Sequence, residues 1–210
     1  MLANKDLFIF GYSGHAYVVL DVSISLGYTP LGYFNPDKVS SDPYKLEFRG
    51  FERDVDVRNI VDNASVFPAV GSNLIRKKIM TDPNFTGLNY PILASPTAVI
   101  SKFSQIAEGT LVAPSAIVQS KAQIGRGSII NTAAVVEHEC LLYDFVHIAP
   151  GAVIAGNVKV KEGAFIGANA TVKEGITIGR GAIIGAGAVI IRDVPAMETW
   201  VGNPGKRIRP

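Results

Sequence analysis

Three consecutive polar residues, Glu137, His138 and Glu139, interrupt a run of small and apolar residues and form the part of the sequence best suited to chemistry. The imidazole group of histidine ordinarily titrates near neutral pH, so it can remove a proton from an attacking nucleophile. A neighbouring carboxylate can fix its tautomer and stabilise its charged form. We therefore expect His138 to be a general base and Glu139 to orient it, with Glu137 as the competing orienting group.

The other side chain that could attack a substrate is Cys140, the one cysteine of the chain. A single cysteine excludes an internal disulfide and a metal site built from cysteines alone. A reactive thiol is usually exposed and close to positive charge, whereas Cys140 falls at a small, inward position of the repeat described next. We expect it to fill space in the core and not to react.

The elements that must position these residues belong to a six-residue repeat between residues 99 and 194. An aliphatic residue occurs at every sixth position, and the residue four positions after it is nearly always small or β-branched. A period of six, with short strands separated by sharp turns, is typical of a parallel β-helix. Three units make one coil of 18 residues, so the repeat predicts about five coils. The aliphatic positions are Ile100, Ile106, Val112, Val118, Ile124, Ile130, Val136, Leu142, Ile148, Ile154, Val160, Ile166, Val172, Ile178, Ile184 and Ile190.

Turn-forming residues agree with this period. The third residue after the aliphatic is often glycine or asparagine, the types that best tolerate a positive φ. These residues are Gly109, Gly127, Gly151, Asn157, Gly163, Asn169, Gly175, Gly181 and Gly187. A solenoid with no chemistry is the alternative, but it does not explain polar residues at positions where packing requires none.

The chain before the repeat has a different pattern, in which short apolar strands alternate with turns and helices. We expect strands at 7–10, 31–35 and 66–70, helices at 16–26 and 74–80, and a loop at 37–58. This alternation predicts a Rossmann-like parallel sheet, whose ligands lie beyond the carboxyl ends of the strands. The residues at that edge are Gly11, Ser13, Asn35, Gly71 and Asn73. The loop 11–15 could hold a phosphate at the start of the first helix, although it lacks the third glycine of the dinucleotide fingerprint. A tight turn without a ligand is the open alternative.

Charge and composition exclude several classes of protein. The net charge is +2, and basic residues run together only in short stretches such as 206–209, which argues against a nucleic-acid partner. No apolar stretch is long enough to span a membrane, and the N-terminus does not look like a signal peptide. We expect a cytoplasmic protein with a Rossmann-like domain at 1–96, a β-helix at 97–194 and a C-terminal tail at 195–210.

The stretch 131–160, with 11–15 and 69–79, resembles the sugar O-/N-acyltransferases of the NeuD and PglD type, and most closely the NDP-4-amino-sugar N-acetyltransferases. The resemblance implies a Rossmann-like α/β domain that binds the nucleotide sugar, followed by a left-handed parallel β-helix. Parallel crossovers are normally right-handed, so the left hand comes from the resemblance alone. It also implies acetyl-CoA as co-substrate, no metal, and a homotrimer, for which Ala149, Val153 and Ala155 could form contacts.

The same resemblance implies roles for individual residues. His138 corresponds to the general base and Glu139 to its orienting carboxylate. Asn131 and His147 match positions that line the acyl and sugar site, and the backbone N–H of Gly156 would meet the thioester carbonyl. Residues that would contact the rest of acetyl-CoA are Gly185, Ala186, Lys206 and Arg207, the last two from the tail. Those that would contact the nucleotide sugar, besides Asn131, are Gly11, Ser13, Gly14, His15, Asn35, Gly71 and Asn73.

Some features depart from this family pattern. Asn35 and Pro36 stand where such enzymes usually carry paired aspartates that contact the nucleotide, so UDP, GDP and dTDP all stay open. Tyr12 and Tyr143 replace smaller residues, which affects the shape of the pocket. A sialic-acid-type O-acetyltransferase and a non-catalytic nucleotide-sugar-binding scaffold are the alternative functions.

A zinc site must also be considered, because γ-class carbonic anhydrases use a similar prism with three histidines. Only two histidines, His138 and His147, fall within the repeat. They are nine residues apart, half of one coil, so within one subunit they lie on different faces and cannot share an ion.

Overall fold

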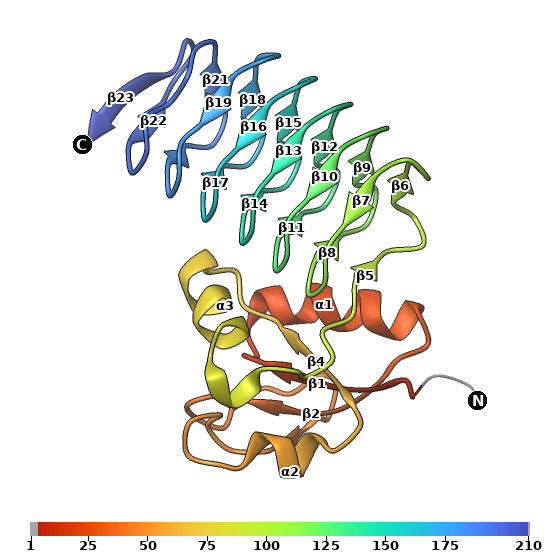
Figure 1. Ribbon diagram of the computed structural model, residues 1–210. Coiled ribbons are helices and arrows are strands. Elements are labelled where there is room, and N and C mark those ends of the chain that lie inside the picture. Colours follow the sequence, from red (N-terminus) through yellow and green to blue (C-terminus); the bar gives the residue numbers. More distant parts are fainter. Residues whose placement is uncertain (1–3, 210) are drawn as a thin grey trace.

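A computed structural model describes residues 4–209 and shows a small α/β unit docked against one side of a parallel β-helix (Figure 1). The predicted fold class is therefore confirmed. Residues 1–3 and 210 of the predicted domains lie outside the described range. The hand of the coil stays a prediction from the family resemblance.

The α/β unit is built on a four-stranded parallel sheet with the strand order β3-β2-β1-β4. Its strands are β1 (Asp6–Phe10), β2 (Thr29–Phe34), β3 (Glu47–Phe48) and β4 (Ser65–Pro68), and its helices are α1 (Gly14–Ser25), α2 (Val57–Val61), α3 (Asn73–Met80) and the 3₁₀-helix η1 (Pro83–Phe85). The expected strands and helices are present, with shifted ends. The expectation of only a loop at 37–58 was wrong, because β3 lies within it and α2 begins there. Elements this short show no periodicity in a sequence.

Three sheets form the sides of the β-helix. Most strands pair in parallel with the strand 18 residues later, as Val135 does with Val153. At the C-terminal end Ile183 pairs with Thr199, 16 residues later, and the last strand runs antiparallel. The docked face, which meets the α/β unit, contains β5 (Leu93–Ala94), β8 (Leu111–Val112), β11 (Ile129–Ile130), β14 (His147–Ile148), β17 (Phe165–Ile166), β20 (Ile183–Ile184), β22 (Thr199–Val201) and β23 (Lys206–Arg209). The apolar face contains β6 (Val99–Ile100), β9 (Ile117–Val118), β12 (Val135–Val136), β15 (Val153–Ile154), β18 (Thr171–Val172) and β21 (Val189–Ile190). The polar face contains β7 (Gln105–Ile106), β10 (Gln123–Ile124), β13 (Leu141–Leu142), β16 (Lys159–Val160) and β19 (Thr177–Ile178).

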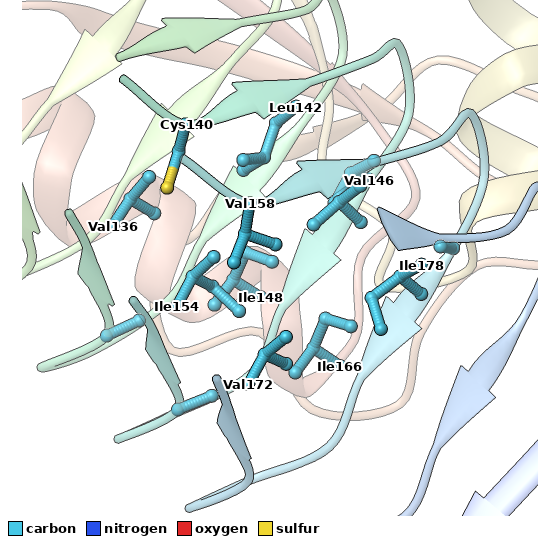
Figure 2. Packing of buried hydrophobic residues seen from close by; sticks show 14 of the residues in the cluster. Val136, Cys140, Leu142, Val146, Ile148, Ile154, Val158, Ile166, Val172 and Ile178 are labelled. Atoms are coloured by element: carbon cyan, nitrogen blue, oxygen red, sulfur yellow. The ribbon is translucent and has the colours of Figure 1, made fainter. Parts of the chain in front are cut away.

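The second residue of each two-residue strand points into the prism and builds its core. From Val112 to Ile190 these aliphatic side chains are at most 3% exposed, while Ile100 and Ile106 in the first coil are partly buried. Figure 2 shows Val136, Leu142, Ile148 and Ile154 meeting along the axis, with Cys140 beside them. The register of bulky and small inward positions predicted from the sequence is confirmed.

The backbone at the third position after each aliphatic is left-handed in every unit from Gly109 to Gly187. Glycine and asparagine account for nine of these positions, as predicted, but Ser115, Lys121, Ala133, Glu139 and Phe145 also have a positive φ. The pairing of successive coils therefore imposes the turn conformation even where the residue type disfavours it.

The α/β unit covers the docked face, and α1 and α3 lie between its sheet and the β-helix (Figure 1). Outward side chains of the docked face, such as Leu111 and Ile129, are buried in one cluster with Leu7, Ile9 and Val19. At the other end of the junction, Phe145 packs in a cluster with Met80 of α3. Since apolar area is removed from water at both places, the two units have a defined relative position.

We predict that Cys140→Ser leaves catalysis intact. The side chain is 1% exposed, its Sγ donates to the carbonyl of Ala155 at 3.0 Å, and burial raises the pKa of the thiol to about 11. A hydroxyl is more costly to bury than a thiol, so the variant should lose roughly 1–2 kcal/mol of unfolding free energy. Thermal unfolding measures the loss of stability, and steady-state turnover of the acetyl transfer that the family resemblance implies measures catalysis. A folded variant without turnover, together with an acetyl group trapped on wild-type Cys140, would contradict this.

Candidate active site

The predicted site residues of the β-helix fall into two columns at two different corners. The Asn131 corner follows the docked face and stacks Gly185 three coils after Asn131, with Ala186 next to Gly185. The His138 corner follows the apolar face and carries His138, Glu139 and Gly156. One side of the prism, the apolar face, separates the two corners within a single chain.

At the His138 corner, the imidazole lies between a carboxylate and a glycine of the next coil. Its Nδ1 is 3.3 Å from Oε2 of Glu139, which leaves Nε2 as the nitrogen available to a substrate. A Cβ at Gly156 would lie 2.6 Å from Cε1 and 2.7 Å from Nε2 of the ring, so only glycine fits below it. An open cavity of about 360 Å³ adjoins the ring and is lined by His138, Gly156, Asn157, Glu174 and Gly175.

Two further contacts hold Glu139, one through its carboxylate and one through its backbone. Glu139 Oε1 is 3.6 Å from Nζ of Lys121, and the Glu139 backbone N–H donates to the carbonyl of Ser120 at 3.1 Å. Within residues 4–209, no hydrogen bond or ion pair joins Glu137 to the ring. Of Glu137 and Glu139, the two carboxylates that could orient His138, the geometry favours Glu139.

The backbone N–H of Gly156 is an available donor beside the imidazole. Its neighbours are paired, since Ala155 N donates to Val172 and Asn157 N donates to His138, at 3.1 and 2.9 Å. Gly156 N itself has no protein acceptor in the part of the chain that the structure describes. A base and a free N–H side by side are the two groups that acyl transfer requires, one for the proton and one for the oxyanion.

The carboxyl edge of the α/β sheet contains a second pocket, with a cavity of about 300 Å³. It brings together Gly11 after β1, Asn35 after β2 and Val70 after β4. Gly11 has a φ of +85°, and a Cβ there would lie 2.3 Å from Cγ1 of Val70, so glycine is required. Ser13 and Gly14 lie where α1 begins, and the side chain of Ser13 makes no capping bond. The N–H of Ala16 donates to the carbonyl of Ser13 at 2.8 Å, so the N–H groups of Gly14 and His15 are the ones open to an anion.

Several lining residues of this pocket could not be found from the sequence. Phe51, Glu52 and Arg53 come from the segment expected to be a featureless loop, and Lys78 comes from α3. Burial raises the pKa of the Glu52 carboxyl above its ordinary value. No local pattern indicates that this segment returns to the sheet edge, because its position depends on β3 pairing with β2.

Asn73 lies at the junction of the two units. Its Nδ2 donates to the carbonyls of Gly163 and Ala164 at 2.9 and 3.0 Å, and its Oδ1 accepts from Nη2 of Arg76 at 2.8 Å. The side-chain amide is thus engaged by protein groups and holds α3 on the β-helix. The helical spacing of Asn73 and Arg76, three residues apart, was the available sequence signal that they share a face.

Arg76 is 1% exposed, and burial lowers the pKa of its guanidinium to about 9. It donates from Nε to the carbonyl of Gly127 at 2.9 Å and from Nη1 to the carbonyls of Val70 and Gly71 at 3.2 and 2.9 Å. Among the described residues no carboxylate pairs with it.

His15 and His147 lie next to this cation, with ring centroids 6.2 Å apart. Burial, and then the charge of Arg76, lowers the pKa of His15 to about 4 and that of His147 to about 3. Both nitrogens of His147 are hydrogen-bonded to protein groups, Nδ1 to Gly71 and Nε2 to Asn131. His147 is therefore poorly placed to replace His138 as a base. Nε2 of His15 is buried without a partner among the described residues.

The predicted CoA contacts of the tail lie at the C-terminal end of the docked face. Gly185 N donates to the carbonyl of Trp200 at 2.8 Å, so the Asn131 corner adjoins β22. Lys206 is exposed on β23, and Arg207 Nε is 3.3 Å from Glu198. Within 4–209, no helix is long and apolar enough to cross a membrane, and no group of three His, Cys, Asp or Glu side chains is placed to hold a metal ion.

Comparisons with known proteins agree on both units. Residues 6–82 match the family described as the PglD N-terminal domain, and residues 157–192 match the bacterial transferase hexapeptide (six repeats). The acetyltransferase domain of PglB from Neisseria gonorrhoeae is 34% identical, with a TM-score of 0.91, over 98% of this chain and 100% of that one. PerB from Caulobacter crescentus, solved with CoA and GDP-perosamine, is 31% identical, with a TM-score of 0.91, over 97% of each chain. WeeI from Acinetobacter baumannii is 26% identical over 96% of this chain and 99% of that one, with a TM-score of 0.86.

An α/β unit with a glycine loop, a hexapeptide β-helix and full-length similarity above 30% identity lead to one assignment: this chain belongs to the NeuD/PglD-type family of sugar acyltransferases.

Proposed function

We propose that this protein transfers an acetyl group from acetyl-CoA to the amine of a nucleotide-linked 4-amino sugar. The observation that carries the proposal is the pairing of His138 Nδ1 with Glu139 beside the unpaired N–H of Gly156. Two relatives support the substrates, because PglB was solved with acetyl coenzyme A and PerB with CoA and GDP-perosamine. Both substrates carry phosphates and do not cross membranes unaided, which supports action in the cytoplasm.

The proposed reaction is a direct transfer within a ternary complex. The sugar nitrogen attacks the thioester carbonyl, and Nε2 of His138 takes the proton that the nitrogen loses. Glu139 stabilises the charged ring, and the N–H of Gly156 donates to the oxyanion. The carbon–sulfur bond then breaks and CoA leaves as the thiol after receiving a proton. The buried Cys140 takes no part.

The proposal requires more than one copy of the chain. His138 and Asn131 are separated by one side of the prism, roughly 15–20 Å at about 3.3 Å per residue. The N-terminal loops and Gly185 lie on the Asn131 side, whereas the base lies on the other. A complete site therefore forms where the His138 corner of one copy meets the Asn131 corner of the next.

The apolar face supplies a surface for that contact. Its outward residues are β-branched and uncharged in every coil, namely Val99, Ile117, Val135, Val153, Thr171 and Val189. We propose that three copies bury this face around a three-fold axis, which closes the ring. Of the residues expected at the interface, Val153 lies on this face, but Ala149 is 4% exposed and is already covered within one chain.

Replacing the base should remove most of the rate. We expect His138→Ala to lower kcat by roughly 10²–10⁴, the usual contribution of a general base, with smaller effects on KM. Glu139→Ala should cost less, and the double variant should resemble His138→Ala, since base and orienter act as one unit. The activity of the wild type should fall at acidic pH, where a general base is protonated, and His138→Ala should lose this pH dependence. A normal kcat with the pH dependence intact would mean that another group is the base.

Gly156→Ala should displace the imidazole. The added methyl group would overlap the His138 ring, so we expect a loss of kcat comparable with that of His138→Ala while the trimer stays folded. The control is the double variant His138→Ala/Gly156→Ala. Since no ring remains to be displaced, the second change should cost little further activity. A full additional loss would assign Gly156 to some other task.

A mixing experiment tests the shared site. The chain mass of 22.4 kDa predicts a trimer of about 67 kDa by sedimentation. Gly14→Asp places a carboxylate at the start of α1 without a steric clash and should block the nucleotide sugar. When this variant is denatured and refolded in equal amounts with His138→Ala, about a quarter of the sites should pair an intact base with an intact acceptor domain. No recovered activity, or a monomer by sedimentation, would place the whole site in one chain.

A further inference from the structure

The orientation of the Asn131 side chain can be deduced from its surroundings. The backbone N–H of Thr132 donates to Oδ1 of Asn131 at 2.8 Å, and only an oxygen can accept that bond. The other end of the amide, Nδ2, therefore faces His147, and lies 3.2 Å from Nε2 of that ring. The amide is thus fixed by a backbone group of its own turn.

This orientation determines the tautomer of His147. An amide nitrogen only donates, so Nε2 of His147 must accept and carries no proton. The proton is then on Nδ1, which donates to the carbonyl of Gly71 at 3.3 Å. Burial and the nearby Arg76 oppose a second proton on this ring, and His15 is the other titratable group beside it.

The carbonyl of Gly71 is in turn held by Arg76. Nη1 of Arg76 donates to it at 2.9 Å, and Nε of the same guanidinium donates to Gly127 of the β-helix at 2.9 Å. A continuous chain of hydrogen bonds thus runs from α3 through Gly71 and His147 to Asn131. Every donor and acceptor in it has one allowed role.

The far end of this chain is an open donor. One N–H of Asn131 is used by His147, and the second has no protein acceptor within residues 4–209. Asn131 is partly exposed at the corner where the acceptor is proposed to bind. We propose that Arg76 is a positioning residue for the acceptor: through Gly71 and His147 it fixes the Asn131 amide so that its free N–H points to an oxygen of the sugar nucleotide. This role rests on the proposed function.

This series of hydrogen bonds gives a reason for a buried Arg76 that has no carboxylate partner among the described residues. If His147 took up a second proton, two N–H groups would face each other at Asn131. The amide would then have to turn, lose its bond from Thr132 and present an oxygen in place of a donor. A fixed positive charge beside the ring disfavours that state at working pH.

The test compares Arg76→Met with Lys77→Met. Lys77 lies on the same helix and pairs with Glu162 of the β-helix, so its loss weakens the same junction but leaves the hydrogen-bond chain intact. We expect Arg76→Met and Asn131→Asp each to lower kcat/KM for the amino-sugar nucleotide roughly 10- to 100-fold, with an unchanged KM for acetyl-CoA. The double variant should lose no more than either single variant. Lys77→Met should keep a kcat/KM for the amino-sugar nucleotide close to that of the wild type.

A second readout does not depend on turnover. In ¹⁵N-labelled trimer, ring NMR should show His147 protonated on Nδ1 alone between pH 5 and 8, and Arg76→Met should show a mixture of tautomers or a protonated ring. If Arg76→Met does not assemble, Arg76→Lys replaces it in the same comparison of single and double variants. Lysine keeps the positive charge but loses the planar set of N–H donors of the guanidinium. Additive losses, an effect equal to that of Lys77→Met, or an unchanged His147 spectrum would overturn the proposal. A wild type that is inactive on every amino sugar would reject the proposed function. The NMR result would still show whether Arg76 fixes the tautomer of His147.

Discussion

Backbone hydrogen bonding between successive coils is the constraint on which the β-helix depends. Each strand pairs with its counterpart one coil later, so each side chain lies above a side chain of the same register. That register fills the axis with aliphatic groups and leaves one backbone conformation for each turn. The left-handed φ of +60° at Glu139 follows from it, at a cost of about 1–3 kcal/mol for a residue other than glycine. The candidate orienting residue is thus held in a strained turn by the coils on either side.

The same stacking explains the composition of the His138 corner. The imidazole extends over the next coil, where any side chain at position 156 would occupy the space of the ring. Glycine therefore serves the site in two ways, because it admits the imidazole and leaves its own N–H uncovered. From the preceding coil, on the side opposite Gly156, Lys121 pairs with the far oxygen of Glu139. The position of the proposed base therefore depends on residues of successive coils that stack on one another, and not on the conformation of a separate loop.

Docking of the α/β unit divides the chemistry between two corners. The unit covers the docked face and brings His15 of the glycine loop, and the hydrogen bonds that run from Arg76 through Gly71 and His147, to the Asn131 side. The base remains on the far side of a β-branched, uncharged face. An apolar face of this kind, flanked by two incomplete half-sites, is suited to contact with another copy of the chain. Assembly and catalysis would then rest on the same surface.

The sequence alone determined the repeat, its inward register, most of the turns and the α/β alternation, because these depend on residue type at fixed spacing. It also singled out His138 and Glu139, since charged and titratable types are unusual for a solenoid turn, whereas Gly156 was identified through the family resemblance alone. It could not reveal that Glu52 and Arg53 return to the sheet edge, or that Asn73 and Arg76 hold the two units together. Those contacts join residues up to 91 positions apart, so they depend on how the two units pack. Only the tertiary structure could show that His147 lies buried beside a cation with both nitrogens engaged, while His138 faces an open cavity.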